Sequence, residues 1–153
     1  MVIYEDTRQK PGRHDNIARF CRAHGIEIIR QSLNVGDYAI AGRGEIAVDT
    51  KMNVLELAMD IFPSHDRFRN ECLRAQRCGI QLIVLTEEIL PGGRLENWLP
   101  PRSSMGVPLV RFNPQTLKRA MLTMQEKYGV KFRFCDVRST GQELLDYLMG
   151  VKT

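Results

Sequence analysis

The chain lacks the features that mark secreted, membrane-spanning and zinc-binding proteins. Its four cysteines form no C-x-x-C pair and no spacing typical of zinc ligands. We therefore expect reduced thiols in the core rather than a disulfide framework. The sequence also has no signal peptide and no apolar run of membrane length. These absences predict a cytoplasmic protein without a membrane partner.

Aromatic residues and net charge are both modest. Aromatic residues make up 7% of the 153 residues, whereas hydrophobic residues make up 43%. This length and this hydrophobic content suit a globular domain with a real core, so we expect residues 1–153 to form a single domain. The net charge of +4 weakly favours a polyanionic partner.

Strand and helix patterns alternate along the chain and predict an α/β protein. We expect strands at residues 2–4, 26–31, 80–86 and 130–135, and helices that begin near Asp15, Asn53, Ser64 or Asp66, Asn113 and Thr140. The helix that begins near Asn53 is expected to end at Pro63. This order of elements predicts a mixed sheet with helices on both faces.

The most informative local pattern is a hairpin. Residues 36–41 and 45–50 are typical of two short strands, and residues 42–44 form a tight connection between them. If the connection is centred on its middle residue, Asp37 faces Asp49 across the hairpin. Directly opposed residues have β-carbons roughly 5 Å apart, where two like charges destabilise the pair unless a cation or a shared proton relieves them.

The alternation of side chains supports this register. One face is apolar and suits a core, with Tyr38, Ile40, Ile46 and Val48. The opposite face is small and polar, with Asp37, Ala39, Ala41, Glu45, Ala47, Asp49 and Lys51. This face has room for a ligand beside the two carboxylates.

A divalent metal ion bound by both aspartates would offset the repulsion between their charges. We predict that Asp37, Asp49 and the main-chain carbonyl of Thr50 bind the ion, with the ammonium of Lys51 alongside. Such a site suits phosphodiester hydrolysis, because the metal offsets charge on phosphate oxygens and lowers the pKa of a bound water. Gly-Asp is also an ordinary turn dipeptide and Asp-x-Lys is common by chance, so the joint pattern carries the prediction.

These motifs resemble a known family. Gly36-Asp37 followed by Val48–Lys51 is similar to the signature of PD-(D/E)XK nucleases, in particular the GD…ERK motif of the XPF-type nuclease domain. The segments at residues 3–9, 66–71 and 80–87 resemble the family's V-D-x-R-E strand, its G-R-F-x-x-E helix start and its buried strand ending in an acid. The resemblance implies a restriction-endonuclease-like mixed central sheet flanked by helices.

Two departures from the family pattern favour a phage or bacterial member. Asp49-Thr50-Lys51 replaces the E-R-K triplet, and Gln9 stands where the family has an acid. We therefore expect the protein in the cytoplasm of a bacterial or phage-infected cell.

The resemblance also implies roles for the site residues. Asp37 and Asp49 would bind Mg²⁺ or Mn²⁺, Lys51 would assist the attacking water, and Asp6 would be a supporting acid. It suggests that Glu71 lies near the metal, without saying whether Glu71 or Asp6 contacts it. The implied substrate is branched, flapped or forked DNA in repair, recombination or replication, and the implied assembly is a homodimer or a complex with a partner protein.

Several arginines are candidates for holding the DNA backbone. Arg67, Arg74 and Arg77 fall within about 80° of one another on a helical wheel with 3.6 residues per turn. Phosphate contacts from such a stripe give affinity without sequence specificity; a solvated helix face is an equal alternative. Arg8 could clamp a phosphate or pair with a neighbouring acid such as Asp6.

The segment 91–110 is predicted to be a long irregular loop, since prolines and glycines are frequent in it. Trp98 could stack on a base, but a lone Trp more often fills the edge of a core. We find no helix-hairpin-helix domain after the last predicted helix, so selectivity for DNA structure would come from a partner, a homodimer or this loop.

The sequence leaves three functions open. The first, which we predict, is a metal-dependent DNA endonuclease. The second is a non-cleaving DNA-binding or recombination accessory module that retains the nuclease fold. The third is an α/β domain that acts on another phosphate ester or a nucleotide.

Overall fold

The computed structural model describes residues 1–62 and 65–153. Pro63 and Ser64, where the sequence predicts a helix end and a helix start, lie outside the described residues. Within the described residues, no helix has the length and apolar character needed to cross a membrane.

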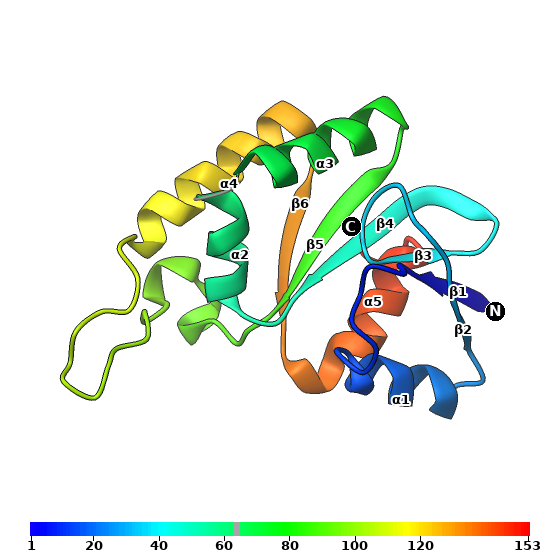
Figure 1. Ribbon diagram of the computed structural model, residues 1–153, viewed down its shortest axis with the longest axis horizontal. Coiled ribbons are helices and arrows are strands. Elements are labelled where there is room, and N and C mark those ends of the chain that lie inside the picture. Colours follow the sequence, from blue (N-terminus) through cyan, green and yellow to red (C-terminus); the bar gives the residue numbers. More distant parts are fainter. Residues whose placement is uncertain (63–64) are drawn as a thin grey trace.

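A mixed six-stranded sheet forms the centre of the fold (Figure 1). In spatial order the strands are β2 (Glu27–Arg30), β1 (Val2–Glu5), β3 (Tyr38–Ile40), β4 (Arg43–Lys51), β5 (Gln81–Glu87) and β6 (Lys131–Cys135). Strand β3 is antiparallel to both of its neighbours, whereas β1 and β2, β4 and β5, and β5 and β6 pair in parallel. The expected α/β architecture is confirmed.

Helices cover both faces of the sheet (Figure 1). Helices α1 (Asp15–Ala23) and α5 (Thr140–Leu148) pack on one face. Helices α2 (Val54–Ile61), α3 (His65–Arg77) and α4 (Pro114–Tyr128) pack on the other. Parallel strands need such crossover connections, which place helices on the sheet faces.

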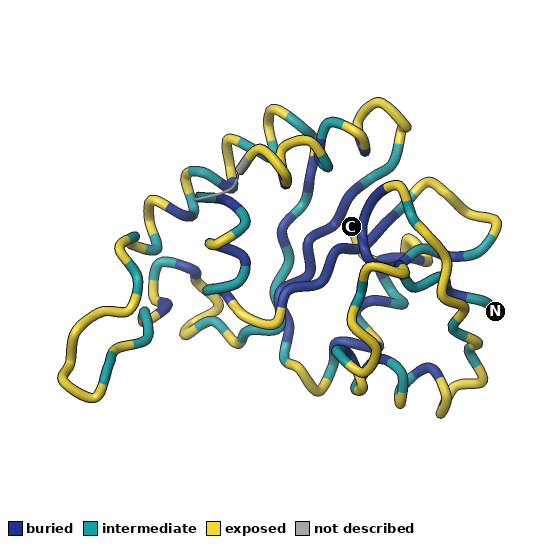
Figure 2. Tube along the Cα trace, viewed as in Figure 1, coloured by how far each residue is buried: buried dark blue, intermediate teal, exposed yellow. Residues whose placement is uncertain are grey.

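Strand β5, which lies between β4 and β6, contributes to two separate cores. Leu82 and Val84 point into the core beneath α2, α3 and α4, and Ile83 and Leu85 point into the core beneath α1 and α5. This alternation follows from the period of two of a strand. It explains why the segment reads as a continuous apolar run, and Figure 2 shows the resulting dark buried track through the middle of the molecule.

The helix starts expected near Asn53 and Asn113 are confirmed, and both residues cap their helices. The side chains of Asn53 and Asn113 accept hydrogen bonds from the N–H groups of Glu56 and Thr116, each at 2.8 Å. The predictions that Asp15 caps α1 and that Thr140 caps α5 are wrong, because each is the first residue of its helix and not its N-cap. His14 occupies the N-cap position of α1 and makes no cap hydrogen bond with its side chain, because its ring is engaged elsewhere in the interior.

The predicted register of the hairpin is confirmed at two pairs away from the turn and is wrong next to the turn. Tyr38 pairs with Val48 and Ala39 pairs with Ala47. Beyond Ala39 the register shifts, so that Ile40 faces Arg43 rather than Ile46. The long strand thus has additional residues without a partner in β3, which is the kind of irregularity that bends a strand.

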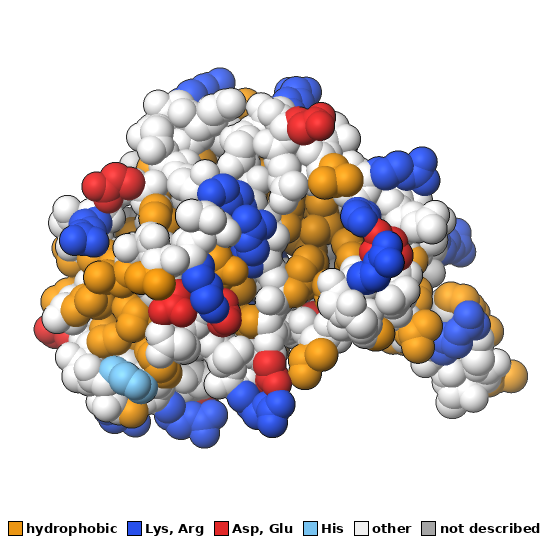
Figure 3. Space-filling view, turned by 180° about the vertical axis from the view of Figure 1, so that it is seen from behind, with side chains coloured by type: hydrophobic (Ala, Val, Ile, Leu, Met, Phe, Trp, Pro, Cys, Tyr) orange, Lys and Arg blue, Asp and Glu red, His pale blue; other side chains and the backbone are white. Residues whose placement is uncertain are grey.

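The segment 91–110 has two parts. The first contains two short 3₁₀ turns, η1 (Pro91–Gly93) and η2 (Leu95–Asn97). Trp98 is buried after them, stacks on Phe112 and donates from Nε1 to Glu88 at 2.6 Å, so it fills the core edge. Residues 99–110 then project from the body (Figures 1 and 3), with several exposed apolar side chains and no acidic one.

The contact between α1 and α5 depends on the absence of a side chain at Gly141. A β-carbon there would lie 2.4 Å from the side chain of Phe20. We predict that Gly141→Ala destabilises the protein by about 1–3 kcal/mol, the usual cost of overpacking a core. This exceeds the gain of about 1 kcal/mol in helix propensity.

Thermal unfolding tests this prediction, with Gly44→Ala as the matched control. A β-carbon at Gly44 meets no atom within 4 Å, so its Tm should stay close to that of the parent. Equal Tm values for Gly141→Ala and Gly44→Ala would contradict the proposed close packing.

Candidate active site

Main-chain hydrogen bonds bring three acidic residues to one edge of the sheet. The N–H of Asp37, just before β3, donates to the carbonyl oxygen of Val48 at 2.8 Å. The N–H of Asp6, just after β1, donates to the carbonyl oxygen of Asp37, also at 2.8 Å. Asp49 follows Val48 in β4. The antiparallel ladder therefore gathers Asp6, Asp37 and Asp49 from three separate segments.

A polar cavity of about 500 Å³ lies at this edge. The four residues predicted to be catalytic all line it: Asp6, Asp37, Asp49 and Lys51. Of the arginines predicted to bind DNA, those that line the cavity are Arg8, Arg67 and Arg74. Arg77 is exposed near the end of α3, beyond these lining residues.

The carboxyl group of Asp37 is held by Thr50. Oδ2 of Asp37 accepts from the N–H of Thr50 at 2.8 Å and from its hydroxyl at 2.7 Å. Asp37 and Thr50 are 8% and 1% exposed, respectively, so these hydrogen bonds are shielded from water. The orientation of the Asp37 carboxyl is therefore defined by the strand that carries Asp49.

Asp49 is a buried acid with several charged side chains nearby. Burial raises its pKa well above the ordinary value, the Lys51 ammonium opposes this shift, and the nearby carboxylates of Asp37 and Glu71 add to it. Oδ2 of Asp49 is paired with Nζ of Lys51 at 2.7 Å. The Lys51 ammonium therefore offsets only part of the effect of burial on Asp49.

Lys51 is a firmly held cation beside this acid. Its ammonium contacts Asp49 at 2.7 Å and Asp60 at 2.8 Å. Burial acts to lower the pKa of Lys51, but the Asp49 and Asp60 carboxylates outweigh burial and raise it above the ordinary value. The prediction that Lys51 points to the same side as Asp49 is confirmed.

Glu71 reaches the same place from α3. Its Oε1 accepts a hydrogen bond from the N–H of Gly36 at 2.8 Å. Gly36 has φ +73°, and a β-carbon there would lie 3.1 Å from both the Ala47 side chain and the Val48 carbonyl oxygen. Only glycine fits this position without strain, so the Gly-Asp pair lies tightly against β4.

Asp6 and Arg8 are engaged with each other and with the next loop. Arg8 pairs with Oδ2 of Asp6 at 2.5 Å, while Oδ1 of Asp6 accepts from the N–H of Leu33 at 3.0 Å. Arg8 also donates to the carbonyl oxygen of Leu33 at 3.0 Å. Both oxygens of Asp6 are thus occupied by the protein, which suits a supporting acid.

The family model for the ERCC4 domain matches residues 6–148 of this chain. The chain belongs to the ERCC4 domain family. No curated protein sequence matches it significantly.

Solved structures show the same fold for this ERCC4 domain. The chain is similar to XPF from Aeropyrum pernix, with a TM-score of 0.69 and 18% identity over 99% of this chain and 65% of that one. It is equally similar to the same protein in complex with DNA, with a TM-score of 0.68 and 18% identity over 98% of this chain and 64% of the other. The chain thus spans just under two thirds of each of these XPF chains. The restriction-endonuclease-like fold is confirmed.

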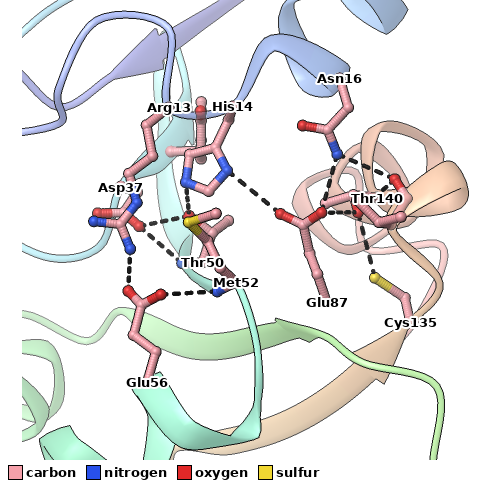
Figure 4. A network of polar contacts seen from close by, with 12 residues as sticks. Arg13, His14, Asn16, Asp37, Thr50, Met52, Glu56, Glu87, Cys135 and Thr140 are labelled. Atoms are coloured by element: carbon pink, nitrogen blue, oxygen red, sulfur yellow. Dashed lines mark hydrogen bonds and ion pairs between the residues drawn. The ribbon is translucent and has the colours of Figure 1, made fainter.

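The ERCC4 domain has polar residues around the site that sequence reasoning missed. Arg13 pairs with Glu56, whose other oxygen accepts from the N–H of Met52 at 3.0 Å (Figure 4). Asp60 was also missed, although its place one residue before the end of α2 gives it access to Lys51. These partners come from separate segments, so no local spacing in the sequence signals them.

The donor set of this ERCC4 domain fits a hard divalent cation. Among the described residues, no three Asp, Glu, His or Cys side chains surround a point by themselves. Mg²⁺ nevertheless takes only one or two carboxylates and keeps several waters. Asp37 and Asp49 both line the cavity, and the raised pKa of Asp49 indicates a place that can take up further positive charge.

The buried charge of Asp49 should make the metal-free ERCC4 domain less stable as pH rises. Because its pKa is higher in the folded chain than the ordinary value of 3.8, the folded state keeps its proton longer than the unfolded state. Stability then falls as pH increases through this interval. We predict that in EDTA at pH 7 Asp49→Asn raises the Tm, by about 2–4 °C for each kcal/mol recovered.

Thermal scans of both proteins between pH 4 and pH 7 test this. The Tm difference should shrink toward pH 4, where Asp49 is neutral in the parent as well. A lower Tm for Asp49→Asn at pH 7 would show instead that the attraction to Lys51 outweighs the effect of burial.

Proposed function

We propose that this ERCC4 domain is a metal-dependent DNA endonuclease that hydrolyses phosphodiester bonds. The observation that carries the proposal is the convergence of Asp37, Asp49 and Lys51 on one polar cavity. Two acids and an ammonium in this arrangement suit hydrolysis of a phosphate diester. We propose that residues 1–153 act as a single nuclease domain.

In this proposal Asp37 and Asp49 hold Mg²⁺ or Mn²⁺, with the Thr50 main-chain carbonyl as a further ligand. When bound, the ion would offset charge on the phosphate oxygens and lower the pKa of a water ligand. Thr50 supports the arrangement because its N–H and hydroxyl both hold the Asp37 carboxyl. Asp6 supports it by holding Arg8.

Lys51 supplies a permanent positive charge next to the reacting phosphate. Its ammonium stays protonated because Asp49 and Asp60 raise its pKa. A protonated lysine can hydrogen-bond the attacking water or an oxygen of the pentacoordinate phosphorus, and it stabilises the negative charge that develops there. It therefore acts as an electrostatic group rather than as a general base.

The arginines around the cavity support DNA as the substrate. Arg8, Arg67 and Arg74 lie on its walls, where they can contact phosphates on both sides of the cleaved bond. The similar XPF from Aeropyrum pernix has been solved in complex with DNA. We propose that Arg77 contacts DNA further along the same helix.

Branched, flapped or forked DNA is the proposed substrate class, with roles in repair, recombination or replication. XPF-type domains commonly pair, so a homodimer or a partner protein is part of the proposal. The projecting residues 99–110 carry Arg102 and no acidic side chain, which suits contact with the second arm of a junction.

Cleavage of a labelled fork tests the proposed chemistry. We expect the parent to cut with Mg²⁺ or Mn²⁺ and Asp49→Asn to lose at least about a thousand-fold in rate, which corresponds to several kcal/mol of transition-state stabilisation. Mn²⁺ should also raise the Tm of the parent but not of the variant, because a bound ligand stabilises only the fold that holds it.

Two other results of these assays would indicate a different function. Tight, salt-sensitive binding of the fork without product in either metal would indicate a non-cleaving accessory module. A hydrolytic activity on nucleotides that excess unlabelled duplex and branched DNA fails to inhibit would indicate a small-molecule phosphate ester as the substrate.

The arginine contacts are tested by binding in EDTA at several salt concentrations. We predict that Arg67→Ala weakens binding of the fork and reduces the salt slope by about one, as expected for the loss of one phosphate contact. Arg77→Ala on the same helix should have a smaller effect because it lies beyond the lining residues. Equal effects of the two substitutions would mean that the DNA follows the whole helix instead of entering the cavity.

A further inference from the structure

A chain of buried polar groups leads from the cavity into the interior (Figure 4). The hydroxyl of Thr50, which donates to Asp37, lies 2.9 Å from Nε2 of His14. Nδ1 of His14 in turn lies 3.4 Å from Oε1 of Glu87. The side chains of His14 and Glu87 are only 2% and 5% exposed, so water does not compete for these contacts.

The hydrogen-bonding capacity of each group sets the direction of this chain. A hydroxyl has one proton, and that of Thr50 is donated to Oδ2 of Asp37. The Thr50 oxygen must therefore act as an acceptor toward the imidazole, so Nε2 of His14 carries the proton that it donates. The second nitrogen, Nδ1, faces Glu87.

Glu87 is itself held at its second oxygen. Oε2 accepts from Nδ2 of Asn16 and from the hydroxyl of Thr140, each at 3.1 Å. These polar contacts thus connect four parts of the fold: β4, the residue before α1, the end of β5 and the start of α5. Glu87 is the acid at the end of the buried strand, and the proposed hydrolysis leaves it without a role.

We propose that His14 is a positioning residue for the proposed hydrolysis. Its Nε2 donates to the Thr50 oxygen and so keeps the Thr50 hydroxyl in the rotamer that donates to Asp37. Its Nδ1 lies 3.4 Å from the Glu87 carboxyl. The carboxyl plane of Asp37 is then defined before an ion or DNA arrives, as preorganised sites require. This inference rests on the proposed function and concerns how its first acid is held.

Two substitutions at position 14 separate the two contacts of the imidazole. His14→Gln places an amide N–H near the position of Nε2 and keeps a donor for Thr50. His14→Asn places its amide near the position of Nδ1, beside Glu87, and loses that donor. Both remove one of the two contacts, so their Tm values should fall by similar amounts.

We expect His14→Asn to lower kcat on the labelled fork about tenfold, the effect of one lost hydrogen bond to a charged or buried network. KM should stay within about twofold, because the side-chain contacts of His14 within the described residues are with Thr50, Glu87 and Tyr38. Affinity for DNA is set mainly by phosphate contacts, which we assign to the arginines that line the cavity. His14→Gln should recover most of the parental kcat. Equal losses of kcat in the two variants would overturn the proposal, as would a loss confined to KM.

Nitrogen NMR of the histidine side chains provides a readout that needs no activity. His14 should carry its proton on Nε2, and Thr50→Val should shift that resonance, whereas the exposed His24 should be unchanged. A proton found on Nδ1 alone would overturn the proposal.

The two tests also separate this inference from the proposed function. A parent chain that cleaves no DNA would contradict the endonuclease, while the NMR result would still decide whether His14 holds Thr50. Titration of Mn²⁺ into His14→Asn and His14→Gln should then show weaker binding only for His14→Asn; equal affinities would overturn the positioning role.

Discussion

The site depends on the crowding of buried acids at one edge of the sheet. The antiparallel ladder places Asp6, Asp37 and Asp49 side by side through hydrogen bonds of the main chain, and α3 adds Glu71. Burial and neighbouring carboxylates then raise the pKa of Asp49. A fold that only maximised stability would place an apolar residue there. A buried acid that Lys51 compensates only in part is consistent with a site that binds a further cation.

The charges around this cluster are arranged in layers. Lys51 lies closest and is shared between Asp49 and Asp60, so it relieves only part of the negative charge. Arginines form the outer walls, where they are exposed enough to contact a polyanion. Since the cavity is acidic at its base and basic at its rim, a cation and a phosphate backbone can occupy it together.

Sequence reasoning was successful where the signal is local. Alternation of Tyr38, Ala39, Ala47 and Val48 predicted both the faces and the register of the hairpin, and it thereby placed Lys51 beside Asp49. The shift at Ile40 was missed because a bulge changes pairing without changing composition. The contacts of His14 with Thr50 and Glu87 were also missed. They join residues distant in sequence, and a single buried histidine has no periodic pattern.

The central claim is that Asp37 and Asp49 share one divalent ion. A crystal structure of the chain with Mn²⁺, measured at a wavelength where manganese scatters anomalously, tests it most directly. The account predicts a single strong anomalous peak within bonding distance of carboxyl oxygens of both residues, at the base of the cavity. A peak that contacts neither aspartate, or two aspartates that point to opposite sides of the sheet, would contradict it.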